Sequence, residues 1–282
     1  MRLAVVGHVE WVDFVRAGRL PVPGEIVAAG DAWEAAAGGG AMAAYALRSL
    51  TGAATFFCGV GDDARGAATV AGLRAAGLGV HAAVRAGAAQ PRTLTWLTDD
   101  HERTITTVGP PVEPRGADPL PWSELSSYDG VVAFAGDAAA LRAARAARVL
   151  VATGRVRAAL LESGVRVDAL VGSASDALET IDDALLAAAR PRFVVRTEGA
   201  AGGAWDGETG AGRWPATPPP GPPVDAFGCG DAFAATLMAG LAAAGDIAAA
   251  CARAAAVGAA VLTRRAPSVG DLAPLWDDAR DG

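Results

Sequence analysis

The chain has 282 residues, 52% of them hydrophobic and 6% aromatic, which is enough to bury a sizeable core built mainly from small aliphatic side chains. Its formal net charge is -7 at pH 7, and all of its basic residues are arginines scattered along the chain. Nucleic-acid binding relies on clustered positive charge, so we expect no nucleic-acid partner.

The first quarter of the chain predicts one buried strand and a small exposed sheet, followed by the start of an α/β alternation. The apolar run at 3–6 is soon interrupted by charge, so it indicates a first strand rather than a signal peptide, and no stretch reaches the length of a membrane span. The other expected elements are strands at 12–16 and 25–28 around the turn PVPG, helical spacing over 34–50, a strand at 54–58 and a helix at 69–75.

A hairpin and a longer α/β alternation come next. The segments 92–97 and 104–108, joined by DDHE, alternate as strands of a hairpin and are assigned to the same small sheet. Strands are then expected at 130–135, 149–152, 169–171 and 193–197, and helices at 138–147, 155–162 and 174–189. This rhythm predicts a doubly wound sheet. Residues 215–223, PATPPPGPP, are expected to form a loop within the domain, before two alanine-rich helices between 232 and 264.

The segment VDAFGCGDAFAATLMAGLA at 224–242 carries the clearest chemistry. Gly228, Cys229 and Gly230 form a glycine-rich turn directly before a long apolar helix, where unpaired backbone N–H groups can hold an anion such as a phosphoryl group in transfer. Asp231 stands beside that turn and would repel a phosphate, so its expected role is a base for a hydroxyl. The structural alternative is a tight turn with Asp231 as a helix cap.

The same segment resembles the DTxGAGDxF signature of the ribokinase-like (PfkB-type) carbohydrate kinases. Asp225, Gly228, Gly230, Asp231 and Phe233 match it, and Cys229 replaces the usual alanine. Six further segments resemble the family in its own order: GRLPVPGEI, AAGGGAMAAYALRSL, FFCGVGDDARG, DDHERTI, TEG and LTRRAPS. The resemblance implies an α/β, three-layer αβα fold with a doubly wound, mostly parallel sheet, as one kinase domain over 1–282 with a small β-sheet lid formed by about 11–30 and 92–108.

Roles for individual residues follow from this resemblance. Asp231 would be the catalytic base, and the amides of Gly228, Cys229 and Gly230 would form the anion hole for ATP, with Mg²⁺ and a monovalent cation such as K⁺ as companions. Asp225 would lie beside the monovalent cation. The implied nucleotide-side residues are Thr197, Gly199, Asp225, Phe227, Val257 and Ser268. The implied substrate-side residues are Glu10, Asp13, Gly38, Gly39, Gly40, Met42 and Arg103.

The sequence departs from the family pattern mainly on the substrate side. Met42 stands where the family has a hydrogen-bonding asparagine, and Val12 stands where it has a sugar-binding acid, with Glu10 favoured over Asp13 as the substitute. The family's magnesium-organising NxxE maps to 173–176, where only Asp176 keeps an acid, so Asp176 is expected either to orient Mg²⁺-bound water or to cap a helix.

The main prediction is therefore an ATP-dependent kinase that phosphorylates a hydroxyl of a small sugar or sugar-like molecule. A weakly catalytic sugar or nucleotide sensor and a nucleoside kinase remain alternatives. A third alternative makes Cys229 a nucleophile, although none of His8, His81 and His101 is an obvious base for it. The three cysteines lack CxxC spacing, which favours a reducing cytoplasm, and the family implies a homodimer through the lid.

Overall fold

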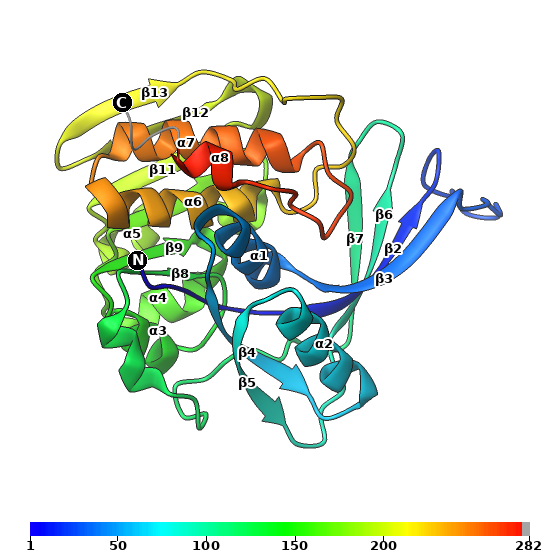
Figure 1. Ribbon diagram of the computed structural model, residues 1–282, viewed down its shortest axis with the longest axis horizontal. Helices are drawn as coiled ribbons and strands as arrows, with labels where there is room; N and C mark the ends of the chain where they lie inside the picture. The colour runs from blue at the N-terminus through cyan, green and yellow to red at the C-terminus, as the bar shows by residue number, and fades with distance from the viewer. Residues whose placement is uncertain (278–282) are drawn as a thin grey trace.

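The computed structural model describes residues 1–277. Within them a nine-stranded sheet has the order β13-β12-β11-β10-β9-β8-β1-β4-β5 and is parallel except for β12 and β13 (Figure 1). Its strands are β1 Leu3–Gly7, β4 Thr55–Gly61, β5 Gly79–Arg85, β8 Gly130–Ala133, β9 Val149–Thr153, β10 Ala169–Ser173, β11 Phe193–Thr197, β12 Gly203–Gly207 and β13 Gly210–Trp214.

Helices cover both faces of this sheet, because the parallel strands are apolar on both sides. In β1, Leu3 and Val5 belong to one core cluster, while Ala4 and Val6 belong to the other. The first face is covered by α1 Gly39–Thr51, α2 Ala64–Ala75, α6 Cys229–Ala244 and α7 Ile247–Val261, with the short α8 Ala273–Asp277 against α1 and α7. The second face is covered by α3 Ala138–Ala144, α4 Arg157–Ser163 and α5 Asp183–Ala189. The expected αβα architecture is confirmed.

A separate four-stranded sheet extends to one side of the body (Figure 1). Its order is β3-β2-β6-β7, from β2 Glu10–Arg16, β3 Asp31–Ala37, β6 Arg92–Leu97 and β7 Arg103–Val108. We call these four strands the small sheet. The predicted hairpin is confirmed as β6 and β7, but the strand expected at 25–28 is wrong, since residues 21–29 form no strand and β3 pairs with β2 instead.

Other differences lie where helix and strand patterns compete. Residues 34–37 belong to β3, so α1 begins only at Gly39, after Gly38 adopts a positive φ of 95°. The helix expected over 174–189 is reduced to a short 3₁₀ turn, Ala177–Glu179, and to α5. Asp182 caps α5 by accepting a hydrogen bond from the Leu185 amide, so the chain before it is free to turn.

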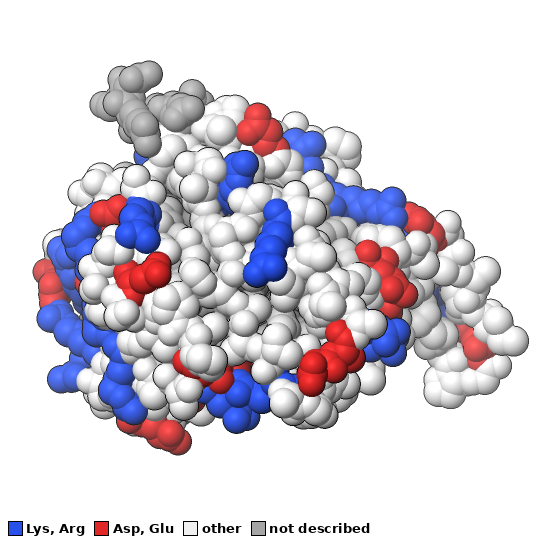
Figure 2. Space-filling view, turned by 60° about the horizontal axis from the view of Figure 1, so that its bottom comes forward, with Lys and Arg blue, Asp and Glu red and all other residues white. Residues whose placement is uncertain are grey.

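The surface agrees with the charge pattern of the sequence. On the face drawn in Figure 2, arginine side chains lie beside acidic ones around the rim, and no single positive area covers that face. Among residues 1–277, no helix is both long enough and apolar enough to cross a bilayer.

Candidate active site

The functional side chains gather where parallel strands end. The carboxyl ends of β1, β9 and β10 lie at one edge of the sheet, and His8, Arg155 and Asp176 follow these three strands. In doubly wound sheets ligands bind at this edge, next to the point where the strand order reverses. Here the order reverses at β1, whose neighbours are β4 and β8.

The glycine-rich turn has the geometry expected of an anion site. Gly228 has a φ of 83°, and α6 begins immediately after it at Cys229, so the first amides of a 16-residue helix have no partners within the helix. A side chain at Gly230 would meet no atom within 4 Å, so open space lies beside the turn. Asp231 is the third residue of α6 and not its N-cap, which contradicts the helix-cap alternative.

Met42 packs against this turn. Its side chain is fully buried, and a Cβ added at Gly228 would lie 2.4 Å from Met42 Cε. The side chain therefore offers no surface to a substrate, and we remove Met42 from the substrate-binding set. Val12 is also fully buried, so this position likewise offers no surface to a substrate.

Two helix N-termini meet at Asp231. A Cβ added at Gly39 would lie 2.9 Å from Asp231 Oδ1, so only glycine lets α1 begin this close to the carboxyl group. The Gly39 amide donates to Nε2 of His8 at 3.1 Å, and burial lowers the pKa of His8 to about 4. His8 is thus a neutral acceptor that orients the start of α1.

Arg155 was not foreseen from the sequence. Its guanidinium donates to Asp176 at 2.5 Å and to Glu179 at 3.0 Å, and its charge acts on both Glu10 and Asp231. Burial raises the pKa of Asp231, and burial together with the Asp231 charge raises the pKa of Glu10 to about 7. The only sequence signal for Arg155 was its place directly after a buried strand and a glycine.

The raised pKa of Glu10 predicts how the folding stability of the protein depends on pH. Because the folded-state pKa lies above the unfolded value of 4.5, the wild-type protein loses stability as the pH rises from about 4.5 to 7. We expect Glu10→Gln to be more stable than wild type at pH 8, by on the order of 1–3 kcal/mol, and to lose this advantage near pH 4.5. Urea unfolding of both proteins at the two pH values measures the difference.

The pKa of His8 is lowered, so His8 makes the folded protein less stable as the pH falls below about 6.5, the opposite direction from Glu10. This effect is the same in wild type and Glu10→Gln, so it cancels in their difference. Glu102→Gln, at an exposed position, controls for the loss of one carboxyl group. A stability difference between Glu10→Gln and wild type that is equal at pH 4.5 and pH 8 would show that Glu10 is not buried beside Asp231.

A cavity of about 190 Å³ opens beside these groups, lined by His8, Val9, Glu10, Pro91, Pro111, Val112, Glu113, Phe134 and Arg155. The predicted substrate residues Gly38, Gly39 and Glu10 adjoin one another, because a Cβ at Gly38 would lie 3.1 Å from Glu10 Oε2. Asp13 is instead paired with Arg92 at 2.6 Å within the small sheet. This favours Glu10 over Asp13 as the acid that faces a substrate.

Comparison with known proteins shows the family of this chain. A family model described as pfkB family carbohydrate kinase matches residues 1–155 and 167–272. The chain belongs to the pfkB family of carbohydrate kinases. No curated protein sequence matches it.

Solved structures of similar fold cover nearly the whole pfkB chain. A putative ribokinase from Agrobacterium tumefaciens has a TM-score of 0.79 at 21% identity, over 99% of this chain and 97% of that one. A microbiome-derived acarbose kinase has a TM-score of 0.78 at 23% identity, over 97% of each chain. An Arabidopsis thaliana ribokinase complexed with ribose and ATP has a TM-score of 0.73 at 19% identity, over 98% of each.

The expected nucleotide-side residues of this pfkB protein divide into two groups. Thr197 ends β11, Gly199 begins a short 3₁₀ turn and Ser268 lies on a loop, and all three have exposed surface. Asp225, Phe227 and Val257 are buried, so their side chains offer little surface to a nucleotide. The Asp225 carboxylate, for example, accepts hydrogen bonds from the amides of Phe227 and Ala266 at 3.1 and 3.2 Å and ties two loops together.

Asp176 does not fit the expected role at Mg²⁺. One carboxylate oxygen accepts from Arg155 and the other accepts from the Leu178 amide at 2.9 Å, which is the capping alternative. In the described part of the chain no group of three or more His, Cys, Asp or Glu side chains is placed to hold a metal ion. We therefore assign no metal contact to Asp176.

The thiol alternative is also disfavoured. Burial raises the pKa of Cys229 to about 12, with further contributions from the charges of Asp225 and Asp231. A protonated thiol is a poor nucleophile.

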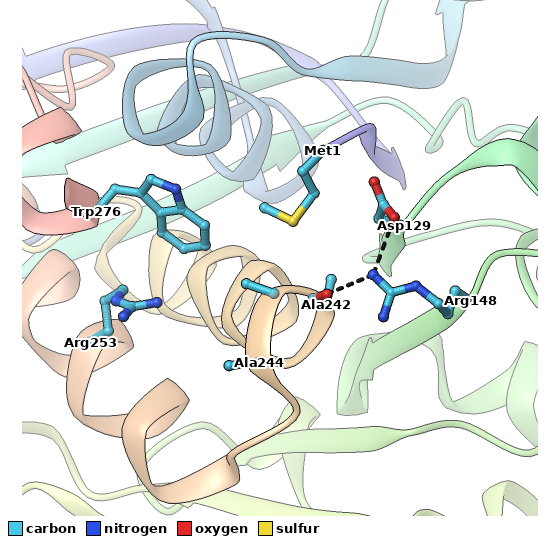
Figure 3. A pocket seen from close by; sticks show the side chains of 8 residues that line it. Met1, Asp129, Arg148, Ala242, Ala244, Arg253 and Trp276 are labelled. Atoms are coloured by element: carbon cyan, nitrogen blue, oxygen red, sulfur yellow. Dashed lines mark hydrogen bonds and ion pairs between the residues drawn. The ribbon is translucent and has the colours of Figure 1, made fainter. Parts of the chain in front are cut away.

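A second hollow, of about 570 Å³, lies at the opposite end of the strands (Figure 3). Its lining includes Met1 and Asp129, just before β1 and β8, and Arg148, which donates to Asp129 at 3.1 Å and to the Ala242 carbonyl at 2.6 Å. Arg253 lies over the ring of Trp276 at 4.8 Å. The hydrogen bonds that the Asp129 carboxylate accepts from the Arg2 amide and from Arg148 hold its pKa below the ordinary value, so it is a poor base.

Proposed function

We propose that this pfkB protein transfers the γ-phosphoryl group of ATP to a hydroxyl group of a small sugar or sugar-like molecule. The observation that carries the proposal is the position of Asp231, beside an open glycine-rich turn at the meeting of two helix N-termini and next to the cavity of Glu10 and Arg155. The complex of the Arabidopsis ribokinase with ribose and ATP supports a sugar as the acceptor and ATP as the donor.

In this mechanism Asp231 accepts the proton of the acceptor hydroxyl as the oxygen attacks phosphorus. Burial raises the pKa of the carboxyl group, which makes it a better base than an exposed aspartate. The amides of Cys229 and Gly230 and the positive end of α6 stabilise the negative charge on the transferred group. Arg155 holds the neighbouring carboxylates and offsets part of their repulsion of a phosphate.

The small sheet acts as a lid in this proposal, and the body and lid together form one kinase domain. Arg103 of β7 already reaches the Ala226 carbonyl at 3.4 Å, next to the glycine-rich turn. Closure over the site would exclude water and suppress hydrolysis of ATP. The proposal includes a homodimer through this sheet, since all six residues of β7 are exposed, including Ile105 and Val108.

The function is tested by measuring ATP consumption with pentoses, hexoses, sugar acids, oligosaccharides and nucleosides in the presence of Mg²⁺. We expect at least one sugar-like compound to raise ATP consumption well above the rate without acceptor, with formation of a phosphorylated product. Turnover with nucleosides alone would favour the nucleoside-kinase alternative. Tight binding of a sugar without turnover would favour the sensor and would contradict the kinase.

A further inference from the structure

The environment of Asp225 differs from that of a monovalent-cation ligand. Its side chain is 1% exposed, and each of its carboxylate oxygens already accepts a backbone amide. A third donor is Nη2 of Arg16, which lies 3.5 Å from Oδ2. Nη1 of the same guanidinium donates to the Val224 carbonyl at 3.2 Å. One internal cation thus contacts both the carboxylate and a carbonyl of this loop.

Arg16 is held in place from both sides. It is the last residue of β2, a central strand of the small sheet, and it is paired with Asp31 of β3 and Leu97 of β6. Its carbonyl also accepts a hydrogen bond from the Gly30 amide at 2.9 Å. The backbone of Arg16 is therefore fixed by strand pairing within the small sheet, and its guanidinium is presented to the loop at 224–227 at a defined position.

Further contacts join the small sheet to the loops of the body. Phe14 packs edge-on against Phe227 with ring centroids 5.1 Å apart, and Nε1 of Trp33 donates to the Ala266 carbonyl at 2.8 Å. The charge of Arg103 also acts on Asp225. Two guanidinium groups from the small sheet therefore face the loop where a single K⁺ was expected.

These residues do not fit K⁺. A bound K⁺ is coordinated by several oxygen atoms that replace its hydration shell, whereas the Asp225 carboxylate and the Val224 carbonyl are engaged by N–H donors. A cation placed there would also lie beside the Arg16 guanidinium and be repelled by it. We infer that Arg16 supplies the positive charge that the family resemblance assigns to K⁺, so that nucleotide binding and turnover in this protein are independent of monovalent cations.

This inference has a structural consequence for the nucleotide loop. A diffusible cation binds whether or not the small sheet is seated, but Arg16 reaches Asp225 only when β2 lies against the loop. The charge beside the glycine-rich turn is therefore coupled to the position of the small sheet. Arg16 is a positioning residue, since it acts on the turn through Val224 and Asp225.

The test rests on the proposed function for its choice of ligand, ADP, but it does not require turnover. Calorimetry of ADP binding and thermal unfolding of the wild-type protein are compared in KCl and in tetramethylammonium chloride at equal ionic strength. We expect ADP affinities that agree within about twofold and equal Tm values in the two salts. A rise of about tenfold in ADP affinity, or a K⁺-specific rise in Tm, would overturn the inference.

Arg16→Ala and Arg19→Ala form a matched pair, because both remove one positive charge from the same segment and Arg19 pairs only locally with Glu25. In tetramethylammonium chloride we expect Arg16→Ala to weaken ADP binding by about tenfold, with partial recovery in KCl, and Arg19→Ala to change nothing. Equal ADP affinity in the two variants would also contradict the inference. If Arg16→Ala fails to fold, the comparison of the wild-type protein in KCl and in tetramethylammonium chloride tests the inference by itself.

The two proposals fail in different ways. A protein that consumes no ATP with any acceptor, yet shows the same ADP affinity and Tm in both salts, would disprove the kinase function and leave the role of Arg16 intact. A protein that turns over sugar only when K⁺ is present would confirm the kinase function and disprove the role of Arg16.

Discussion

Asp231→Asn is expected to lower kcat by about 10³-fold or more while ADP affinity and Tm stay at or above their wild-type values. Asparagine has the same shape, but its amide cannot accept a proton from the attacking hydroxyl at neutral pH. Loss of the buried negative charge also removes repulsion of phosphate, so nucleotide binding should not weaken. Turnover is measured with the best acceptor from the sugar panel, and ADP binding by calorimetry.

Asp246→Asn is the matched control. Asp246 is the N-cap of α7, where it accepts hydrogen bonds from Ala248 and Ala249, and asparagine is nearly as good a cap as aspartate. This variant should keep full activity and stability. Near-normal turnover of Asp231→Asn would mean that Asp231 is not the base, and the proposed mechanism would have to be abandoned.

Gly228→Ala is expected to lower the free energy of unfolding by about 2–4 kcal/mol and to reduce kcat strongly. The new methyl group would lie 2.4 Å from Met42 Cε, and alanine is strained at a φ of 83°. Relief of either strain would shift the turn and therefore the amides of Cys229 and Gly230. Thermal unfolding should show a Tm lower by about 5–10 °C.

Gly230→Ala provides the comparison for stability. A Cβ at Gly230 meets no atom within 4 Å, and the residue lies in the first turn of α6, where alanine favours helix more than glycine does. We expect its Tm to equal or slightly exceed that of wild type. Equal Tm values for Gly228→Ala and Gly230→Ala would contradict the close packing of Met42 against the turn.

Elements with a strong local pattern were predicted correctly. The alternation in 92–97 and 104–108 identified β6 and β7, and the apolar run at 193–197 identified β11, because period-two patterning and buried strands are visible in a short window. The β12–β13 hairpin was missed, since GAWDGETGAGRW has four glycines and little alternation. That hairpin is stabilised by pairing with β11.

The glycine-rich turn and the start of α6 were predictable for the same reason. A glycine turn followed by an apolar helix creates unpaired amides from a single continuous segment, so Gly228, Cys229, Gly230 and Asp231 could be assigned their expected roles from spacing and family resemblance. The substrate side was less accessible. Met42 aligned with a substrate ligand, but its burial beneath Gly228 depends on how α1 packs against α6.

The amino-acid sequence alone indicated the family, most of the order of strands and helices, and the place of Asp231 just after a glycine-rich turn, all of which depend on neighbours along the chain. Only the folded chain placed Arg155 among Glu10, Asp176, Glu179 and Asp231, and brought Arg16 to a loop 208 residues away. Such pairings depend on which strands lie side by side and which surfaces close on each other. An arginine in the sequence carries no sign of the carboxylate that it will meet, because long-range contacts are set by packing of the whole core.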